Sequence, residues 1–229
     1  LLKTNLSTKW EIDEKNSLEN SFIVYEDLSK NNNDRYQYIF PNFNFSKNVE
    51  ISEKYNGSFD FRSYGFNKNY NTNVKETSIT NDFLFGSNNY ILNHGIIYNY
   101  DFLIKNSNSY SENSSNFDEN TDYNVYEIVK FDTSYPLINQ TVDFTNYLTP
   151  KFSFKYSPNG NTDMSDKNIL INYDNAFSLN RIGTNYQVEG GKSLTIGLEY
   201  KGVHEKRGEI FDFKIGNILS DKKKNKMPT

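Results

Sequence analysis

The stretch Leu148–Lys201 reads LTPKFSFKYSPNGNTDMSDKNILINYDNAFSLNRIGTNYQVEGGKSLTIGLEYK. The apolar residues that alternate with polar or small neighbours are Phe152, Phe154 and Tyr156 near its start and Leu194, Ile196, Leu198 and Tyr200 near its end. A period of two residues is the side-chain period of a β-strand. Ser157-Pro158-Asn159-Gly160 is a turn signal, because proline and glycine favour turn conformations. The stretch therefore predicts two strands separated by a long polar connector.

The composition is unusual for a chain with an aliphatic core. Of 229 residues, 18 are Tyr and 18 are Phe, while hydrophobic residues make up only 35%. Such an aromatic bias fits a surface that is half apolar and half wet. An exposed antiparallel sheet has such a surface, and so does a β-barrel with aromatic girdles in a membrane. The mean hydropathy of −0.79 is compatible with a barrel, because only every second residue of a barrel strand meets lipid.

Several classes of function lack their usual signals. A net charge of −4 gives no basic face for nucleic acid, and no run of ~18 apolar residues predicts a membrane-spanning helix. The absence of cysteine excludes a thiolate metal site. The two histidines, His94 and His204, are expected in exposed turns and do not form a metal-binding pair. Gly191-Lys192-Ser193 lacks the earlier glycine of a phosphate-binding loop, since position 186 is Tyr. We therefore expect no enzymatic activity, cofactor or metal.

Alternating segments separated by Asn, Gly and Lys turns predict an all-β, antiparallel, up-and-down sheet. The nine expected strands are Ser21–Leu28, Arg35–Ser46, Gly57–Asn67, Val74–Gly86, Gly95–Lys105, Tyr123–Tyr135, Lys151–Ser157, Leu194–Lys201 and Glu209–Gly216. The alternation slips by one residue at Pro41 and again at Arg62-Ser63, and each slip predicts a β-bulge. Residues 1–20 are polar and predict no strand, and the tract Asn106–Asp122 predicts a mobile loop. Pro136-Leu137-Ile138 is expected to end the strand before it.

The segment Gly95–Lys105 has the clearest alternation. Its apolar row is Ile96, Tyr98, Tyr100, Phe102 and Ile104, and its polar residues on the other face are Asn99, Asp101 and Lys105. Further polar residues at alternating positions are Lys151, Lys155, Glu199, Asp212 and Lys214. Charges are costly on a lipid face and tolerable in a hydrated lumen. The pattern therefore predicts a wall with its apolar face toward lipid and its polar face toward a lumen.

The connector combines acid, amide, aromatic and basic residues within a short distance. Its candidate residues are Asp174, Asn175, Phe177, Ser178 and Arg181, followed by Glu189, Gly190 and Gly191. We expect it to fold back into a barrel mouth or lumen, with Phe177 on the wall and Asp174 and Arg181 in structural hydrogen bonds. An unpaired charge there would cost several kcal/mol. The alternative is a loop in water that leaves Phe177 exposed.

This part of the sequence resembles the C-terminal barrel of the LPS-assembly protein family, LptD, also called organic solvent tolerance protein. The segments that carry the resemblance are Leu148-Thr149-Pro150, Ser157-Pro158-Asn159, Asp174–Arg181, Val188-Glu189-Gly190-Gly191 and Ile196–Tyr200. The chain departs from the family in two places. Tyr186-Gln187 stand where the family often has Asp-Arg, and Ser165-Asp166-Lys167 matches its acidic connector only in part.

The resemblance implies that residues 1–229 are a middle segment of a large transmembrane barrel, truncated at both ends and lacking the family's periplasmic N-terminal domain. It implies an outer-membrane protein of a Gram-negative bacterium that inserts lipopolysaccharide into the outer leaflet. The implied partners are lipopolysaccharide, membrane lipid, an LptE-like lipoprotein plug and, through the N-terminal domain, an LptA-like periplasmic bridge. The alternation alone fits a general porin equally well. A secreted β-sandwich adhesin is a third possibility, although sandwich strands seldom exceed ~10 residues.

Overall fold

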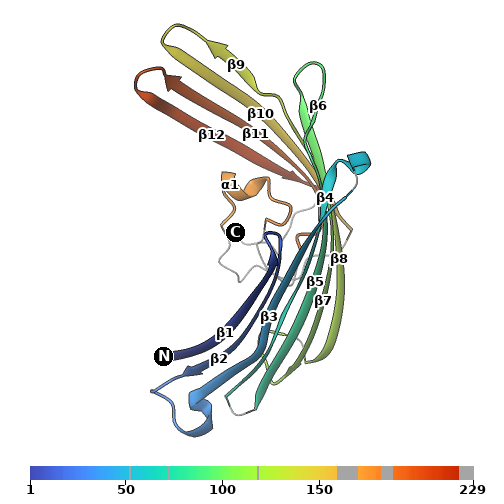
Figure 1. Ribbon diagram of the computed structural model, residues 1–229, viewed down its shortest axis with the longest axis vertical. Coiled ribbons are helices and arrows are strands. Elements are labelled where there is room, and N and C mark those ends of the chain that lie inside the picture. Colours follow the sequence, from blue (N-terminus) through green and yellow to red (C-terminus); the bar gives the residue numbers. More distant parts are fainter. Residues whose placement is uncertain (52, 72, 118, 159–169, 182–187, 222–229) are drawn as a thin grey trace. The chain divides into compact units, whose positions relative to one another are not determined.

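The computed structural model of the protein is almost entirely β-strand (Figure 1). It describes residues 1–51, 53–71, 73–117, 119–158, 170–181 and 188–221. The strands are β1 (Leu2–Asp13), β2 (Asn16–Glu26), β3 (Tyr36–Glu50), β4 (Gly57–Tyr70), β5 (Val74–Ser87), β6 (Tyr90–Ile91), β7 (Ile97–Glu112), β8 (Asn120–Ser134), β9 (Leu137–Gln140), β10 (Phe144–Ser157), β11 (Gly191–His204) and β12 (Gly208–Ser220). The helical elements are the 3-10 turns η1 (Asn32–Arg35) and η2 (Glu53–Tyr55) and the short helix α1 (Tyr173–Ala176).

The described strands form one twelve-stranded sheet that follows the order of the sequence. Its main path runs β1-β2-β3-β4-β5-β7-β8-β10-β11-β12, with β6 beside β7 and β9 beside β10. The path has two ends, β1 and β12. The strand pairs whose register is resolved are all antiparallel. The all-β, antiparallel, up-and-down prediction is therefore confirmed.

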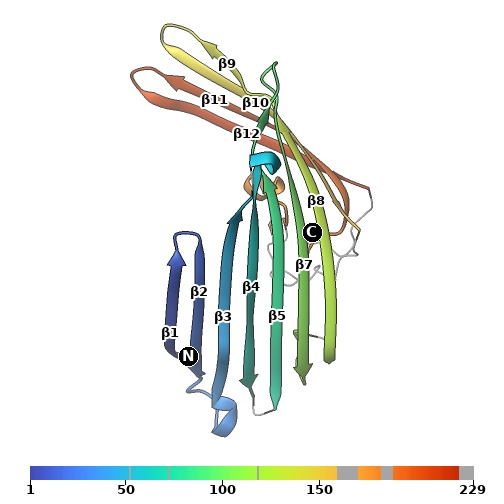
Figure 2. The ribbon, with the colours of Figure 1, turned by 45° about the vertical axis from the view of Figure 1, so that its right-hand side comes forward.

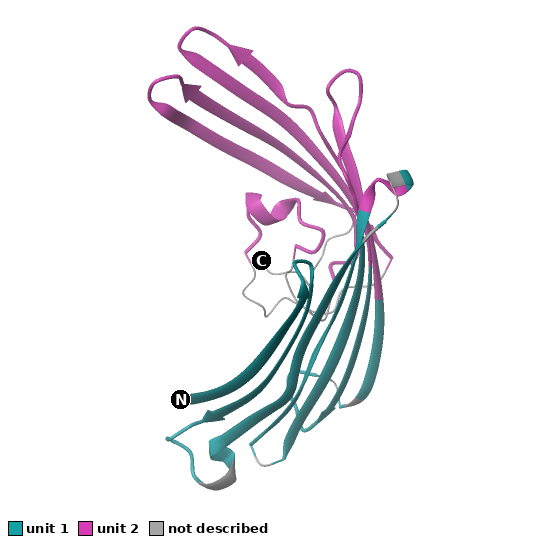
Figure 3. Ribbon diagram, viewed as in Figure 1, with its two compact units in different colours: residues 1–54, 58–85, 104–125 teal, residues 55–57, 86–103, 126–229 magenta. Residues whose placement is uncertain are grey.

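The chain divides into two compact units, which are coloured separately in Figure 3. Unit 1 comprises residues 1–54, 58–85 and 104–125, and unit 2 comprises residues 55–57, 86–103 and 126–229. In unit 1, β1 to β5 form a meander in which each strand lies beside the next (Figure 2). In unit 2, β10 pairs with β8, β9 and β11, and β11 pairs with β12.

The structure contains the first of the two predicted bulges, and the second is tested along the edge that β4 shares with β3. The pairing of β3 with β4 slips between Ile39 and Asn42, on either side of Pro41, as predicted. Between β3 and β4 the register is continuous through Arg62 and Ser63, so the second predicted bulge is absent where β4 pairs with β3. The aromatic residues there change parity because β4 carries rings on both faces. Tyr64 lies on the polar face, where its hydroxyl donates to Asp82 (3.3 Å).

The side-chain burial of the sheet is the reverse of that in a water-soluble domain. Among the described residues, buried apolar side chains are limited to Leu103, Tyr126, Ile128, Ala176 and Val188. The buried polar or charged residues are Ser21, Glu76, Ser78, Thr80, Lys105, Ser107, Ser111, Lys130, Ser153, Lys155, Ser157, Arg181, Glu189, Ser193 and Thr195. On β7 the predicted apolar row is exposed at Tyr100 and Phe102, whereas Lys105 on the opposite parity is buried. On β5, β7, β10 and β11 the exposed face is thus mainly apolar and the buried face mainly polar, whereas β1 and almost all of β12 are exposed on both faces.

Two predictions of element boundaries are wrong. Residues 1–20 contain β1 and most of a hairpin, with Trp10 paired to Leu18. The tract predicted as a mobile loop is mainly strand, because β7 continues to Glu112 and β8 starts at Asn120. The strand before Pro136 ends at Ser134, as expected, and residues 137–140 form a further strand, β9, which pairs with β10.

Candidate functional site

The connector between β10 and β11 forms a structured segment around α1. The Asn172 side-chain oxygen accepts hydrogen bonds from the backbone N–H groups of Asp174 (3.0 Å) and Asn175 (3.2 Å). In return, Asn175 Oδ1 accepts a hydrogen bond from the backbone N–H of Asn172 (2.9 Å). This reciprocal capping box satisfies free N–H groups at the start of the helix. Asn175 therefore has a local role, which is to start α1.

Two aromatic rings of the connector lie against two glycines of the sheet. Gly197 of β11 is the direct partner of Gly216 of β12. A Cβ atom on Gly197 would lie 2.5 Å from Phe177 Cζ, and a Cβ atom on Gly216 would lie 3.3 Å from the Tyr173 ring. The two rings contact each other at a centroid distance of 5.5 Å. Because neither glycine has a side chain, both rings can pack directly on the polar face at this pair.

The Glu199 carboxylate binds the Tyr173 side chain to the sheet. Glu199 of β11 accepts hydrogen bonds from the Tyr173 hydroxyl (3.0 Å) and from Lys151 Nζ (2.6 Å). Burial raises the pKa of Tyr173, and the hydrogen bond to Glu199 raises it further. The phenol therefore stays protonated and remains a donor. Lys151 Nζ also lies 6.0 Å from the centroid of the Phe177 ring.

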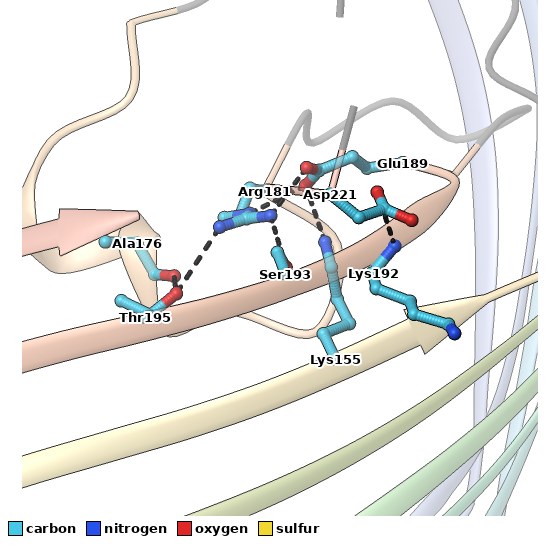
Figure 4. Close-up of polar contacts among 8 residues, drawn as sticks. All are labelled: Lys155, Ala176, Arg181, Glu189, Lys192, Ser193, Thr195 and Asp221. Carbon is cyan, nitrogen blue, oxygen red and sulfur yellow. Dashed lines mark hydrogen bonds and ion pairs between the residues drawn. The ribbon is translucent and has the colours of Figure 1, made fainter. Parts of the chain in front are cut away.

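A buried ionic cluster also attaches the connector to the sheet (Figure 4). We call it the Arg181 cluster, and its residues are Arg181, Glu189, Lys155, Ser193 and Thr195. Arg181 binds the Glu189 carboxylate in a bidentate manner, with Nε to Oε2 at 2.6 Å and Nη2 to Oε1 at 2.5 Å. Lys155 Nζ donates to the same Oε2 at 2.5 Å. Arg181 also donates to Ser193 Oγ (2.8 Å) and Thr195 Oγ1 (3.4 Å). Planar bidentate pairing of this kind is the strongest form of a charge-assisted hydrogen bond.

Glu189 is needed because the sheet places two lysines directly opposite each other. Lys155 of β10 is the partner of Lys130 of β8, and both side chains are buried on the polar face. Like charges directly across a strand pair are destabilising. Lys130 lies 2.5 Å from Asp132 and 3.6 Å from Asp101, whereas Lys155 takes its carboxylate from the connector. The connector therefore supplies the countercharge that β10 lacks.

The electrostatics of the cluster favour the ionised carboxylate. Burial alone would raise the pKa of Glu189, but the hydrogen bond from Arg181 and the charges of Lys155 and Arg181 outweigh it and lower the pKa to about 2. Both carboxylate oxygens accept hydrogen bonds from cations. Such an arrangement is a structural clamp that fixes the connector on the polar face.

The predicted site residues separate into distinct roles. Arg181 binds the Glu189 carboxylate, which confirms the structural hydrogen bond expected for it, and the Phe177 ring packs on the sheet at Gly197. The carboxyl group of Asp174 is exposed and has no partner among the described residues, so the hydrogen bond predicted for Asp174 is made by its backbone N–H instead. Ser178 ends α1 through its backbone N–H, which donates to the Asn175 carbonyl oxygen (2.9 Å).

The glycines after Glu189 lead into the next strand. Gly190 is buried, and Gly191 begins β11 with φ of 89°, a left-handed conformation that favours glycine. The segment Gly191-Lys192-Ser193 thus belongs to a strand start. Two places noted for the family resemblance, Ser165-Asp166-Lys167 and Tyr186-Gln187, lie outside the described residues, as do Asn159 and Gly160 of the predicted turn.

Sequence reasoning missed a second clamp, in unit 1. Glu76 of β5 is 2% exposed and accepts hydrogen bonds from Lys68 Nζ (3.1 Å) and the Tyr70 hydroxyl (2.8 Å) of β4. Ser114 Oγ (2.6 Å) and Asn116 Nδ2 (2.8 Å), from the segment after β7, donate to the same carboxylate. The sequence signal for this clamp is the alternation of Glu76 with Ser78 and Thr80, because this pattern places Glu76 on the polar face. Two of its partners, Ser114 and Asn116, come from the tract predicted as a mobile loop.

Other candidate groups do not assemble into a site. His94 is exposed in the turn before β7, whereas His204 is half-buried at the end of β11 and packs on Phe144, contrary to the exposed turn expected for it. Among the described residues, no three His, Cys, Asp or Glu side chains are placed to hold a metal ion. No helix within the described ranges is long and apolar enough to cross a membrane.

Comparison with known proteins adds no family assignment. No protein-family model matches the sequence, and no curated protein matches it significantly.

The Arg181 cluster predicts a large effect of Arg181→Ala on folding. The substitution leaves Glu189 buried with Lys155 as its remaining cation, and removing one partner of a buried ion pair costs ~3–5 kcal/mol. The folded fraction should fall, as measured by heat-modifiable migration in electrophoresis. Asp174→Ala, an exposed position in the same connector, is the control and should fold normally. Normal folding of Arg181→Ala would contradict the structural role.

The low pKa of Glu189 predicts an acid-sensitive contribution to stability. The folded-state pKa, about 2, lies below the ordinary glutamate value of 4.5, so the ionised carboxylate contributes fully above pH ~4.5 and loses its contribution as pH falls toward 2. Urea unfolding of the wild type and of Glu189→Gln should therefore differ most at neutral pH. The difference should shrink between pH 4.5 and 2. A difference that does not depend on pH would contradict the assignment.

The glycine pair predicts that Gly197→Ala is destabilising. The new methyl group would lie 2.5 Å from Phe177 Cζ, and overpacking of this kind typically costs about 1–3 kcal/mol. Gly202→Ala in the same strand is the matched control, because its nearest neighbours would be 3.6 Å and 3.8 Å away. The free energy of unfolding in urea measures both. Adding Phe177→Ala should relieve the clash, and equal effects of the two alanines would contradict the packing described.

Proposed function

We propose that this chain forms part of the wall of an outer-membrane β-barrel that transports lipopolysaccharide. The observation that carries the proposal is the reversed burial of the sheet. On β10 the exposed residues are Phe152, Phe154 and Tyr156, and the buried ones between and beside them are Ser153, Lys155 and Ser157. On β11, Leu194 and Ile196 are exposed, whereas Ser193 and Thr195 are buried.

A continuous exposed apolar surface needs an apolar partner. Contiguous apolar patches beyond a few hundred Å² mark interaction surfaces in soluble proteins. In this sheet the pattern runs along neighbouring strands, because Phe154 is the partner of Phe131 on β8 and of Leu194 on β11. A bilayer supplies an apolar partner for such rows, and outer-membrane barrels alternate apolar-out and polar-in along each strand. Membrane insertion therefore accounts for the pattern across several strands.

The β-sandwich alternative fits less well. The main-path strands are 11 to 16 residues long, whereas sandwich strands seldom exceed ~10 residues. Two packed sheets would also bury their apolar faces against each other. In this chain Tyr100 and Phe102 are exposed.

Lipopolysaccharide is favoured as the cargo by the sequence resemblance, which lies in the connector and its flanking strands. The resembling segments include Arg181 and Glu189 of the Arg181 cluster, as well as Phe177, which contacts Gly197. The polar face is rich in lysine, carboxylate and hydroxyl groups, which are compatible with a phosphorylated sugar head group. A general porin uses the same kind of polar face, and it remains the second candidate. An LptE-like plug and an LptA-like bridge are the partners that the first candidate requires.

The membrane part of the proposal predicts a strong effect of Phe154→Lys. A lysine on the lipid face near the bilayer midplane costs about 2–4 kcal/mol, so insertion into phospholipid vesicles should fall. Val142→Lys is the control, because Val142 is 87% exposed between β9 and β10. Co-sedimentation with vesicles and protease protection measure insertion. In a soluble sandwich, Phe154→Lys would remove an exposed aromatic ring and improve solubility instead.

The cargo is tested in cells depleted of this protein. For a lipopolysaccharide transporter, newly made lipopolysaccharide should disappear from the cell surface and accumulate at the inner membrane, as measured by pulse labelling and membrane fractionation. Re-expression of the wild-type protein should restore its surface level. Normal lipopolysaccharide export combined with reduced uptake of a small hydrophilic solute would favour the porin instead.

A further inference from the structure

A groove on the polar face of unit 1 has both apolar and polar walls. It has a volume of about 410 Å³ and lies over β2, β3 and β4, which are neighbours in the meander (Figure 2). The apolar side chains that line it include Ile23, Ile39 and Phe66, and the polar ones include Tyr25, Gln37 and Asn42. All of these residues belong to unit 1.

The register assigns the apolar side chains of the groove to the polar face. Ile39 of β3 is the direct partner of Ile23 of β2 and of Lys68 of β4. Lys68 Nζ lies 3.1 Å from Glu76 on the polar face, and direct partners across strands point to the same side. Phe66 lies two residues before Lys68 and therefore shares this face. The three apolar side chains are half-buried, so apolar surface opens into the groove on the polar face.

The next row of side chains carries polar groups and a cation. Lys3 of β1, Tyr25 of β2 and Gln37 of β3 are direct partners across three neighbouring strands. The Lys3 ammonium group lies 5.7 Å from the centroid of the Tyr25 ring. Tyr25 is two residues from Ile23 along β2, so this polar row lies directly beside the apolar row. The groove therefore combines an apolar surface with a cation at one end.

The charge of Lys3 is available to an anion. Lys3 is exposed and forms no ion pair with the residues that the structure describes. Lys9, on the same face of β1, differs in this respect: its Nζ lies 2.6 Å from Glu11, and its direct partner on β2 is Glu19. The positive charge beside the groove thus lacks the carboxylates that balance the other lysine of this strand.

We propose that this groove binds one molecule of a fatty acid, with its carboxylate at Lys3 and its acyl chain on Ile23, Ile39 and Phe66. Removing apolar side chains and an acyl chain from water favours binding, and Lys3 supplies the countercharge. Ligand pockets range over ~300–1,000 Å³, so a groove of about 410 Å³ suits one acyl chain rather than a lipid with several. The inference goes beyond the proposed transport function, because it assigns a separate ligand to the polar face.

The test uses dodecanoic acid that carries a photoreactive diazirine at the far end of its chain. The full chain is reconstituted in dioleoylphosphatidylcholine vesicles and irradiated with the probe, and tandem mass spectrometry assigns the adducts to residues. Adducts on Ile39 and Phe66 should saturate with probe concentration and should disappear with excess unlabelled dodecanoic acid. Tyr38, which is 45% exposed on the other face of β3, reports probe dissolved in the bilayer, and its labelling should not saturate.

Two variants separate the charge from the apolar surface. Lys3→Ala should raise the half-saturating probe concentration about fivefold, the upper end for an exposed ion pair, whereas Lys9→Ala is the matched control and should leave it unchanged. Ile39→Gln should abolish saturable labelling of Phe66. Its glutamine suits a face that already carries Gln37, and heat-modifiable migration checks its folding. Because Lys3 is exposed, its variant tests the proposal independently of folding.

The outcomes distinguish the ligand site from the membrane location. Equal effects of the two lysine variants, or equal labelling by the uncharged methyl ester of the probe, would overturn the anionic ligand. Labelling of Tyr38 without saturable labelling of Phe66 would overturn the groove site and leave the membrane location intact. Saturable labelling of Phe66 without labelling of Tyr38 would support the groove site and contradict the membrane location.

Discussion

The two-residue repeat of the β-strand assigns every side chain of the sheet to one of two faces. Where the register between neighbouring strands is resolved, the assignment continues from strand to strand: Lys155 faces the same side as Lys130 and Ser193, whereas Phe154 faces the other side with Phe131 and Leu194. A slip of one residue would exchange the two faces completely. The separation of apolar from polar surface, and every functional inference drawn from it, depends on this register.

Buried charge on the polar face determines how the connecting segments fold. Glu76 and Glu189 are each 2% exposed, and a buried carboxylate without partners would be strongly destabilising. Glu189 brings the connector onto β10 and β11, while Glu76 holds Ser114 and Asn116 beside β4 and β5. In both units a segment that looks like a solvated loop in the sequence therefore has a defined place on the sheet.

Sequence alternation was sufficient to predict strands wherever one face was clearly apolar, as at Phe152–Tyr156. It failed where neither face was clearly apolar. In β1 the apolar row is interrupted by Thr4 and Thr8, and the end of β7 carries Asn106 and Asn108 on the exposed face. For the site, the mixed composition of the connector was enough to expect a structural hydrogen bond for Arg181. The contribution of Lys155 was not predictable, because it depends on a contact between residues 34 positions apart.

In the transport function proposed above, the contacts of the connector limit the part of the polar face that a solute can reach. Tyr173 and Phe177 cover the glycine pair, and Arg181 donates hydrogen bonds to the hydroxyl groups of Ser193 and Thr195. Those groups already have protein partners, so a passing solute would have to displace a bidentate ion pair to reach them. The polar face near Gly197 is thus the surface on which the protein's own connector packs. Substitutions there act first on folding, and a direct effect on transport is expected from polar residues that the connector does not cover.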